Sequence, residues 1–395
     1  MWDVVVVGLG GVGSFALRSL ARRKRDILLT KNSHKSLNIL GLERFSIGHT
    51  HGSSHGKSRI YRHAYFEHEH YVPLLLYSSN EFRLLEQQHE SKKRNIIMQC
   101  GTLVVDSVKK LGSKTNKEKI VGKDSIRHDA SKEQHHHQHQ GLVAACHRSA
   151  NQHNIPVQYM TSLELRKRYP QFIFQDDDIG LLEPGGGFVR PELAVRAALD
   201  DAMEGGAKVK ENVCVTSIEE VVEGTDDNRD SCDNDGGHVI LHVEDGDDIM
   251  AKKVIVSGGA WMGKLIPEWS SHLHVTRQIQ AWIDVGNDAS YESYEMPTWI
   301  RSSWSDSSSD NDEVAIYGIP ADPLSNEPSW IKVAIHGRND IVDDVDEAIP
   351  RPLVTNGEMK ELQLAAQDFL RPDADTTRTR KKQHSWLSSS PYPFY

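Results

Sequence analysis

The segment Asp3–Gly13 constrains the fold more than any other part of the chain. It reads DVVVVGLGGVG, four consecutive valines followed by glycines that include Gly8, Gly10 and Gly13. An unbroken run of β-branched residues is typical of a parallel strand that is covered on both faces. The three glycines match the G-x-G-x-x-G spacing. The first allows a tight turn, the second lets backbone approach a pyrophosphate, and the third lets a helix pack closely on the strand.

A helix is predicted directly after this turn, over Ser14–Arg23, because apolar residues recur on one face. Its positive N-terminal end would face the phosphates. The glycine spacing alone is weak support, whereas its place between a strand and a helix is the context that identifies a dinucleotide site. The alternative is a glycine turn that merely packs. The predicted cofactor contacts here are Gly8, Gly10, Gly11, Val12 and Gly13.

Composition limits the possible partners. With 395 residues, 38% hydrophobic and 26% charged, the chain should form a soluble protein of two domains. Its net charge of −10 argues against nucleic acid or an anionic membrane as the main partner. We find no run of about 18 apolar residues and no signal peptide, and therefore expect no membrane span and a cytoplasmic or peroxisomal location. The four cysteines form no C-x-x-C pair, so no metal site is predicted.

A second strand is predicted over Leu37–Leu42 and is followed by Glu43. A carboxylate at this place accepts hydrogen bonds from the adenosine ribose. It usually follows the glycines by about 20 residues, whereas Glu43 follows Gly13 by 30. We attribute the excess to an inserted polar loop over Lys24–Ser36.

The segment Gly48–Tyr65 is too rich in glycine, serine and histidine for a regular element. A long loop directly after a cofactor strand is typically functional. Arg59 and Arg62 are three residues apart, so a short helical turn would project both to one side. The alternative is a pair of solvent-exposed arginines. The tract His135–His139 is predicted to be a disordered or solvated loop, since its surroundings define no metal geometry.

Further elements follow from hydrophobic periodicity. The strand Trp330–His336 would place Lys332, Ala334 and His336 on one face. The strand over Ala251–Ser257 ends in small residues, which suits a sheet edge that meets a cofactor. The predicted helices are Tyr71–Glu90, Leu142–His153, Ser162–Tyr169 and Pro191–Gly205, and the other strands lie within Ile96–Asp106, Gly180–Arg190, Ala207–Val221, His238–Val243, Val275–Val285 and Val314–Pro320.

Several motifs in order resemble one protein family. The most specific is His55–Tyr65, HGKSRIYRHAY; supporting matches are Glu183–Phe188, Ile255–Trp261, Tyr317–Pro320 and Lys332–His336. From residue 3 to about residue 375 the chain resembles the monomeric sarcosine oxidase family, which includes N-methyltryptophan oxidase and pipecolate oxidase. That family belongs to the D-amino-acid-oxidase-like flavoproteins.

The resemblance implies an α/β (α+β overall) fold with a Rossmann-like FAD-binding domain and a mixed-sheet substrate domain. We expect the FAD-binding domain over 1–95 and 155–265, and the substrate domain over 96–154 and 266–375. The implied cofactor is FAD. The implied reaction is oxidation of a secondary amino acid by dioxygen, giving an imine and hydrogen peroxide. The implied oligomeric state is a monomer.

The resemblance also implies roles for individual residues. Arg59 would lie against the flavin, Lys332 near its N5 as the base-like group that activates dioxygen, and Arg62 on the substrate carboxylate. Tyr317 and His336 would line the substrate pocket. Positive charge from Arg59 and Lys332 would stabilise the negative charge that develops during the reaction; the alternative for Lys332 is a solvated strand residue. The implied FAD contacts beyond the glycine turn are Glu43, Arg44, Ser53, Ser54, Val215, Gly258 and Trp261.

The C-terminal part departs from the family pattern. No cysteine follows Cys232, no glycine follows Gly357, and the final residues are not a peroxisomal S-K-L address. We therefore expect a truncated or misassembled C-terminus with a disordered tail over 376–395, an incomplete FAD-binding domain, and no covalent flavin attachment through the family's cysteine. Two other functions stay open: an NAD(P)-linked dehydrogenase, and a catalytically impaired flavin-binding protein.

Overall fold

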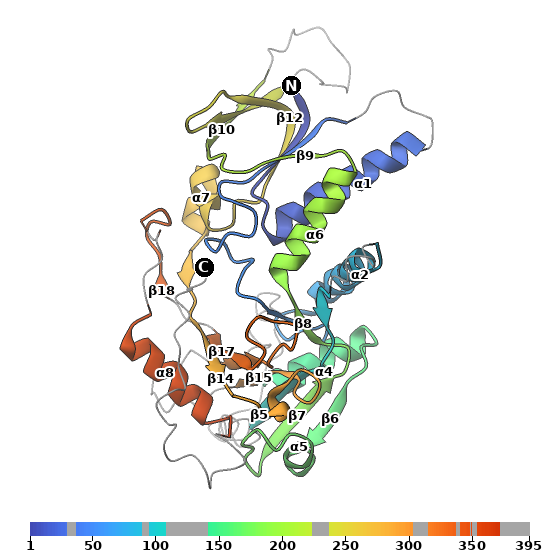
Figure 1. Ribbon diagram of the computed structural model, residues 1–395, viewed down its shortest axis with the longest axis vertical. Coiled ribbons are helices and arrows are strands. Elements are labelled where there is room, and N and C mark those ends of the chain that lie inside the picture. Colours follow the sequence, from blue (N-terminus) through green and yellow to red (C-terminus); the bar gives the residue numbers. More distant parts are fainter. Residues whose placement is uncertain are drawn as a thin grey trace, which may run out of the picture.

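The computed structural model describes residues 1–29, 37–88, 95–107, 141–222, 237–302, 315–336, 340–347, 349 and 354–371. The predictions for the histidine-rich tract and for the tail over 376–395 lie outside these residues. The described chain forms two large sheets, one in the upper half of Figure 1 and one in the lower half. The mixed α/β fold class is confirmed. Within the described residues, no helix combines the length and the apolarity that crossing a membrane requires.

The upper sheet has six strands, and its centre is the valine strand β1 (Trp2–Val7). β1 pairs in parallel with β2 on one side and with β12 on the other. Val5 and Val6 are fully buried, as expected for a strand covered on both faces. The other strands of this sheet, in sheet order around β1, are β10 (Val215–Val221), β11 (His238–Val243), β12 (Ile249–Val256), β2 (Ile39–Leu42) and β9 (Lys208–Lys210).

Helices α1 (Gly11–Leu29), α6 (Pro191–Glu204) and α2 (Val72–Gln88) lie below and to the right of this sheet in Figure 1. The prediction that residues 24–36 form a loop is wrong at its beginning, because α1 continues to Leu29. The polar residues there are held by α6 and the turn that follows it: Lys24 Nζ donates to the Gly206 carbonyl at 3.1 Å.

A buried arginine ties these three helices together. The Arg18 side chain is 1% exposed. Its Nε donates to Asp201 Oδ2 of α6 at 2.7 Å, and its Nη1 donates to Glu81 of α2. Arg22 and Arg25 give the two carboxylates a second partner at 2.9 and 3.1 Å. The charges are therefore compensated within the helix layer, as buried charges must be.

The lower sheet has seven strands and carries an aromatic core on one face. Phe172 stacks on Phe369 with ring centroids 4.6 Å apart, and Trp299 packs against both rings. A Cβ at Gly318 would lie 2.4 Å from the Trp299 ring, so this strand needs glycine there. In sheet order the strands are β14 (Gln280–Asp284), β17 (Trp330–His336), β16 (Ala315–Ile319), β15 (Thr298–Ser302), β5 (Thr102–Ser107), β7 (Asp178–Glu183) and β6 (Gln158–Thr161).

The remaining elements are short or lie beside the lower sheet. The helices there are α4 (Leu142–Gln152), α5 (Ser162–Arg168) and α8 (Asn356–Gln367), the last at the lower left of Figure 1. There are also two small sheets among the described residues. One has three strands, in the order β3 (Arg59–Tyr61), β8 (Gly187–Val189) and β4 (Ile97–Met98). The other pairs β13 (Thr276–Arg277) with β18 (Asp340–Ile341). The short helical turns are η1 (Glu69–Tyr71), η4 (Gly259–Trp261), α7 (Met262–Leu265), η5 (Pro267–His272) and η6 (Ala289–Tyr291).

The pairing of β6 and β7 bears on the division into domains. Both strands pair in the lower sheet, β7 directly with β5, although the expected FAD-binding domain resumes at residue 155. The chain returns to the upper sheet only after Glu183, through β8 and α6. We therefore propose that the second piece of the FAD-binding domain begins close to residue 184.

Candidate cofactor and active site

A cavity of about 620 Å³ lies at the carboxyl ends of β1, β2 and β12. This is the edge at which open parallel sheets bind their ligands. Val7, Leu42 and Val256, the last residues of the three strands, line it. So do eleven of the residues predicted to contact the cofactor: Gly8, Gly10, Gly11, Val12, Glu43, Arg44, Ser53, Ser54, Val215, Gly258 and Trp261.

The glycine turn at the cavity floor has no room for a side chain at Gly8 or Gly13. Gly8 has φ +84°, and a Cβ there would lie 2.4 Å from the Ser257 carbonyl oxygen. Gly13 lies behind the turn, where a Cβ would lie 1.8 Å from the Gly8 carbonyl oxygen. Gly11 N–H donates to Ser54 Oγ at 2.8 Å. The turn therefore brings backbone to the cavity wall at the N-terminus of α1, which is a favourable place for a pyrophosphate.

Glu43 fixes the same turn from the end of β2. Its Oε2 accepts from Leu9 N–H at 2.8 Å, and its Oε1 accepts from Phe45 N–H at 3.1 Å. His49 Nε2 lies 3.3 Å from that oxygen. Burial by itself would raise the pKa of Glu43, but these hydrogen bonds outweigh burial and lower the pKa. The group is therefore a carboxylate, with lone pairs left for ribose hydroxyls.

Arg44 and Trp261 meet an acidic residue that the sequence analysis missed. Asp346 Oδ1 accepts from Arg44 Nη1 at 2.7 Å and from Trp261 Nε1 at 2.8 Å, and Lys264 Nζ donates to Oδ2 at 2.6 Å. Burial opposes ionisation of Asp346, but the bonds from Lys264, Trp261 and Arg44 lower its pKa to about 2. Asp346 follows β18, so a segment from beyond the lower sheet forms part of the cavity wall.

A second cluster lies next to the cavity and is built on one carbonyl oxygen. Lys332 is 2% exposed, and its Nζ donates to the Ser58 carbonyl. Arg59 Nη1 donates to the same oxygen at 2.9 Å. Arg59 Nη2 donates to the carbonyl of Ser53, a residue that lines the cavity, at 2.6 Å. The two predicted cations are therefore brought together at the edge of the dinucleotide cavity.

Burial controls the protonation of this cluster. It lowers the pKa of Lys332 well below its usual value, with a smaller contribution from Arg59. Burial also lowers the pKa of Arg59, although a guanidinium keeps its proton at any physiological pH. Lys332 is therefore the member of the pair that can exchange a proton.

Strand register places Tyr317 on the same face as Lys332. In the lower sheet, Ala334 of β17 pairs with Tyr317 of β16 on one side and with Gln280 of β14 on the other. Gln280 Nε2 donates to Tyr317 Oη at 3.2 Å, a contact that the sequence did not predict. Burial raises the pKa of Tyr317, so it stays a neutral phenol. His336 ends β17 two residues after Ala334 and is exposed.

Arg62 is not part of this cluster. The prediction that a helical turn aligns Arg59 with Arg62 is wrong, because Arg59–Tyr61 is extended and pairs with β8. Arg62 Nη2 donates to both carboxylate oxygens of Glu67, at 2.9 and 3.2 Å. Its guanidinium carbon lies 4.0 Å from the Phe66 ring centroid.

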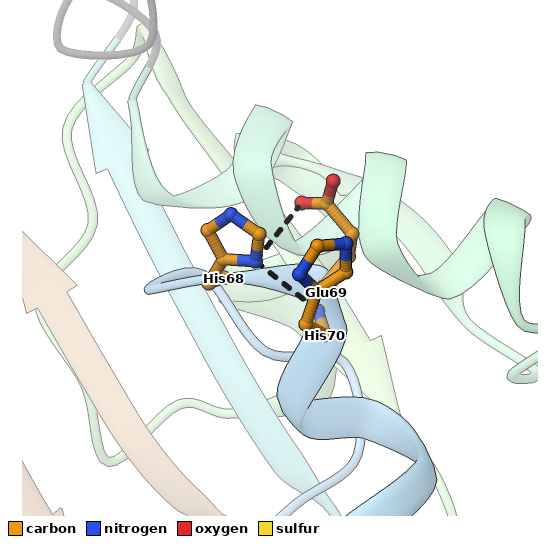
Figure 2. A group of neighbouring side chains, drawn as sticks. All are labelled: His68, Glu69 and His70. Carbon is orange, nitrogen blue, oxygen red and sulfur yellow. Dashed lines mark hydrogen bonds and ion pairs between the residues drawn. The ribbon is translucent and has the colours of Figure 1, made fainter. Parts of the chain in front are cut away.

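One surface group could hold a metal ion. His68, Glu69 and His70 offer ligand atoms that lie within 4.8 Å of one another. Figure 2 shows these side chains at the start of the turn that leads into α2. His68 Nδ1 already accepts from His70 N–H at 3.2 Å. The group lies outside both the cavity and the lysine cluster.

Comparisons with known proteins agree with this geometry. The family described as FAD dependent oxidoreductase (DAO) matches residues 3–381. Monomeric sarcosine oxidase of Streptomyces avermitilis is 28% identical over 321 residues, 81% of this chain and 66% of that protein. N-methyl-L-tryptophan oxidase of Yersinia pestis is 29% identical over 283 residues, 71% of this chain and 59% of that protein. The chain thus spans about 59–66% of the length of these curated relatives.

Solved structures with a similar fold include NikD, an unusual amino acid oxidase essential for nikkomycin biosynthesis. It has a TM-score of 0.66 at 19% identity, over 94% of this chain and 79% of that chain. Glycine oxidase from Geobacillus kaustophilus has a TM-score of 0.59 at 15% identity, over 93% of this chain and 78% of that chain. At these identities the likeness concerns the fold alone.

Proposed function

This chain belongs to the FAD dependent oxidoreductase family, whose cofactor is FAD, and from that premise we propose that it oxidises secondary amino acids. The substrate would be sarcosine, another N-methyl amino acid or pipecolate, and the products an imine and hydrogen peroxide. One observation carries the proposal: a buried lysine and a half-buried arginine share the Ser58 carbonyl beside the dinucleotide cavity.

The residues of the cavity fit FAD. The side-chain-free surface at Gly10 and Gly11 lets a pyrophosphate approach the N-terminus of α1. Glu43 is ionised and lies at the end of β2, where a ribose binds. The cavity continues to Ser53, whose carbonyl accepts from Arg59, so a ligand that fills it would extend toward the lysine cluster.

Bound FAD would accept a hydride equivalent from the amine and pass the electrons to dioxygen. Arg59 would supply a permanent positive charge where negative charge develops, and Lys332 would hold and release a proton at Nζ. Arg62 would exchange Glu67 for the substrate carboxylate, to which its planar fork can bind through two parallel hydrogen bonds. Tyr317 and His336 would line the substrate pocket.

The absorbance spectrum of the purified protein, before and after acid precipitation, reports flavin content and attachment. Flavin reduction is then followed without oxygen in the presence of sarcosine, pipecolate or N-methyltryptophan, and hydrogen peroxide is measured in air. A colourless protein that binds NAD would favour a dehydrogenase. A yellow protein that no secondary amine reduces would favour a non-catalytic flavin-binding role.

The role of Lys332 has its own test. Lys332→Met should slow flavin reoxidation far more than flavin reduction, because only reoxidation needs the proton and charge at Nζ. Lys253→Met, at an exposed position of β12, is the matched control and should change neither rate. Equal slowing of both steps by Lys332→Met would contradict the assigned role.

A further inference from the structure

The turn Gly56–Ser58 carries the carbonyl on which the lysine cluster is built, and a glutamate from another element holds this turn. Glu192 is the second residue of α6. Its Oε1 accepts from Gly56 N–H at 2.7 Å and from Lys57 N–H at 3.0 Å. Ser58 N–H donates back to the Gly56 carbonyl at 2.8 Å. One carboxylate oxygen therefore binds two consecutive backbone amides of the turn.

The turn needs this support because its backbone is strained. Lys57 has φ +68°, in the left-handed region, which costs a non-glycine residue roughly 1–2 kcal/mol. Such conformations persist where surrounding contacts impose them, and they gather at functional sites. Here the strained residue comes directly before Ser58, so the direction of the Ser58 carbonyl depends on it.

The Ser58 carbonyl in turn sets the positions of two cations. Lys332 Nζ and Arg59 Nη1 both donate to it. Lys332 is buried within β17, and we expect its amine to shift when this acceptor moves. The negative charge of Glu192 also acts on both cations, opposing the effect of burial on each.

We infer that Glu192 is a positioning residue for the oxygen-reacting centre: it holds the turn Gly56–Ser58 and so fixes the acceptor shared by Lys332 and Arg59. The inference deepens the proposed function, since it rests on the role given to Lys332. The sequence contains no motif that marks Glu192, because its relation to Lys332 arises only when α6, the loop before β3 and β17 come together.

The first test measures, in the apoprotein, how readily the turn Gly56–Ser58 opens. Trypsin cleaves after Lys57, whose exposed side chain leaves the site accessible once the turn opens. Glu192→Ala removes both hydrogen bonds and should raise the rate of cleavage after Lys57 at least fivefold. Glu192→Gln keeps an oxygen acceptor and should be cleaved at nearly the wild-type rate. Glu204→Ala, at the exposed end of the same helix, is the control and should leave the rate unchanged.

The second test needs no amine substrate. The flavin of the holoprotein is reduced with dithionite and mixed with oxygenated buffer. Glu192→Ala should slow reoxidation by about tenfold, since displacing a catalytic group by ~1 Å can cost up to about 100-fold. Glu192→Gln should restore most of the rate. Should Glu192→Ala fail to fold, Glu192→Asp, one methylene too short to reach both amides, replaces it.

Two results would overturn the inference: cleavage after Lys57 that Glu192→Ala leaves unchanged, or faster cleavage with unchanged reoxidation, which would make Glu192 a structural residue only. Failure of the proposed function has a different signature. In that case amines would not reduce the flavin, while both the cleavage and the reoxidation of chemically reduced flavin could still respond to Glu192.

Discussion

Gly13→Ala tests whether the close contact between α1 and the glycine turn forms the dinucleotide site. The added Cβ would lie 1.8 Å from the Gly8 carbonyl oxygen and 2.4 Å from Ser257 Oγ. Ordinary contacts begin at 3.4 Å, so the distance between the new Cβ and the Gly8 carbonyl oxygen must increase by 3.4 − 1.8 = 1.6 Å. The Gly8 carbonyl belongs to the backbone of the turn after β1, so it cannot rotate away as a side chain would. The start of α1 must therefore move away from β1.

The cost follows from two opposed effects. Overpacking of this kind destabilises by about 1–3 kcal/mol, and a backbone obstacle puts Gly13 at the upper end. Alanine regains about 1 kcal/mol over glycine inside a helix. We expect a net loss of about 2 kcal/mol in the unfolding free energy of the apoprotein. Because the helix N-terminus moves with the turn, the Kd for FAD should rise at least about tenfold, equivalent to about 1.4 kcal/mol.

Urea unfolding of the apoprotein measures the first quantity, and titration with FAD measures the second. Gly11→Ala is the matched control for stability. Its Cβ would meet only Ser54 Oγ, at 3.1 Å, and this side chain need shift by only a few tenths of an ångström. Its urea midpoint should stay near that of the wild type. The reasoning fails if Gly13→Ala unfolds at the wild-type urea concentration and binds FAD with unchanged affinity.

Three further substitutions test the packing and electrostatics. Arg18→Met should lower the unfolding free energy by about 3 kcal/mol, because it leaves two buried carboxylates with one arginine each. Glu358→Gln should cost about 1–2 kcal/mol at pH 6 through its bond with Arg277, and less as the pH falls. Tyr317→Phe should cost about 1–2 kcal/mol, because the buried Gln280 amide loses its partner. Urea unfolding measures each loss.

The pH dependence at Glu358 has a definite sign. Burial opposes ionisation, but bonds from Arg277 and from Thr355 lower the pKa of Glu358 to about 2 in the folded chain, against an ordinary 4.5. The charged form is thus favoured by folding. Its contribution is complete above pH 4.5 and is lost as the pH falls toward 2. A difference from Glu358→Gln that stays constant between pH 6 and pH 3.5 would contradict this. Arg148→Met is the control for Arg18→Met. It removes an exposed arginine and should lower the unfolding free energy far less than Arg18→Met does.

The strand, glycine turn and helix that line the cavity could be predicted because their signals are local. β1 contains four consecutive valines, the glycines follow at once, and the geometry of a parallel strand, turn and helix leaves little freedom. Glu43 was found for the same reason, since it ends the next strand of the unit. Glu43 lines the cavity, its contact with a ribose stays a prediction, and part of the presumed insertion is a continuation of α1.

The contacts of the lysine cluster and of Asp346 could not be predicted, because they are made between distant segments. Lys332 lies 274 residues from Ser58, and Asp346 lies 302 residues from Arg44. Asp346 stands in an acidic stretch that resembles any solvated loop. The orientation of Arg62 depends on whether Arg59–Tyr61 is extended or helical, and that is decided by pairing with β8 rather than by local preference.

The order of strands in the upper sheet has a consequence for synthesis. β1 leaves the ribosome well before its neighbour β12, which ends at Val256, so one edge of the valine strand stays without its native neighbour until most of the described chain has been made. Such an edge is a template for unwanted pairing between nascent chains. A protein with this architecture should depend on chaperones that bind early, and its yield should improve when translation is slowed by cooling.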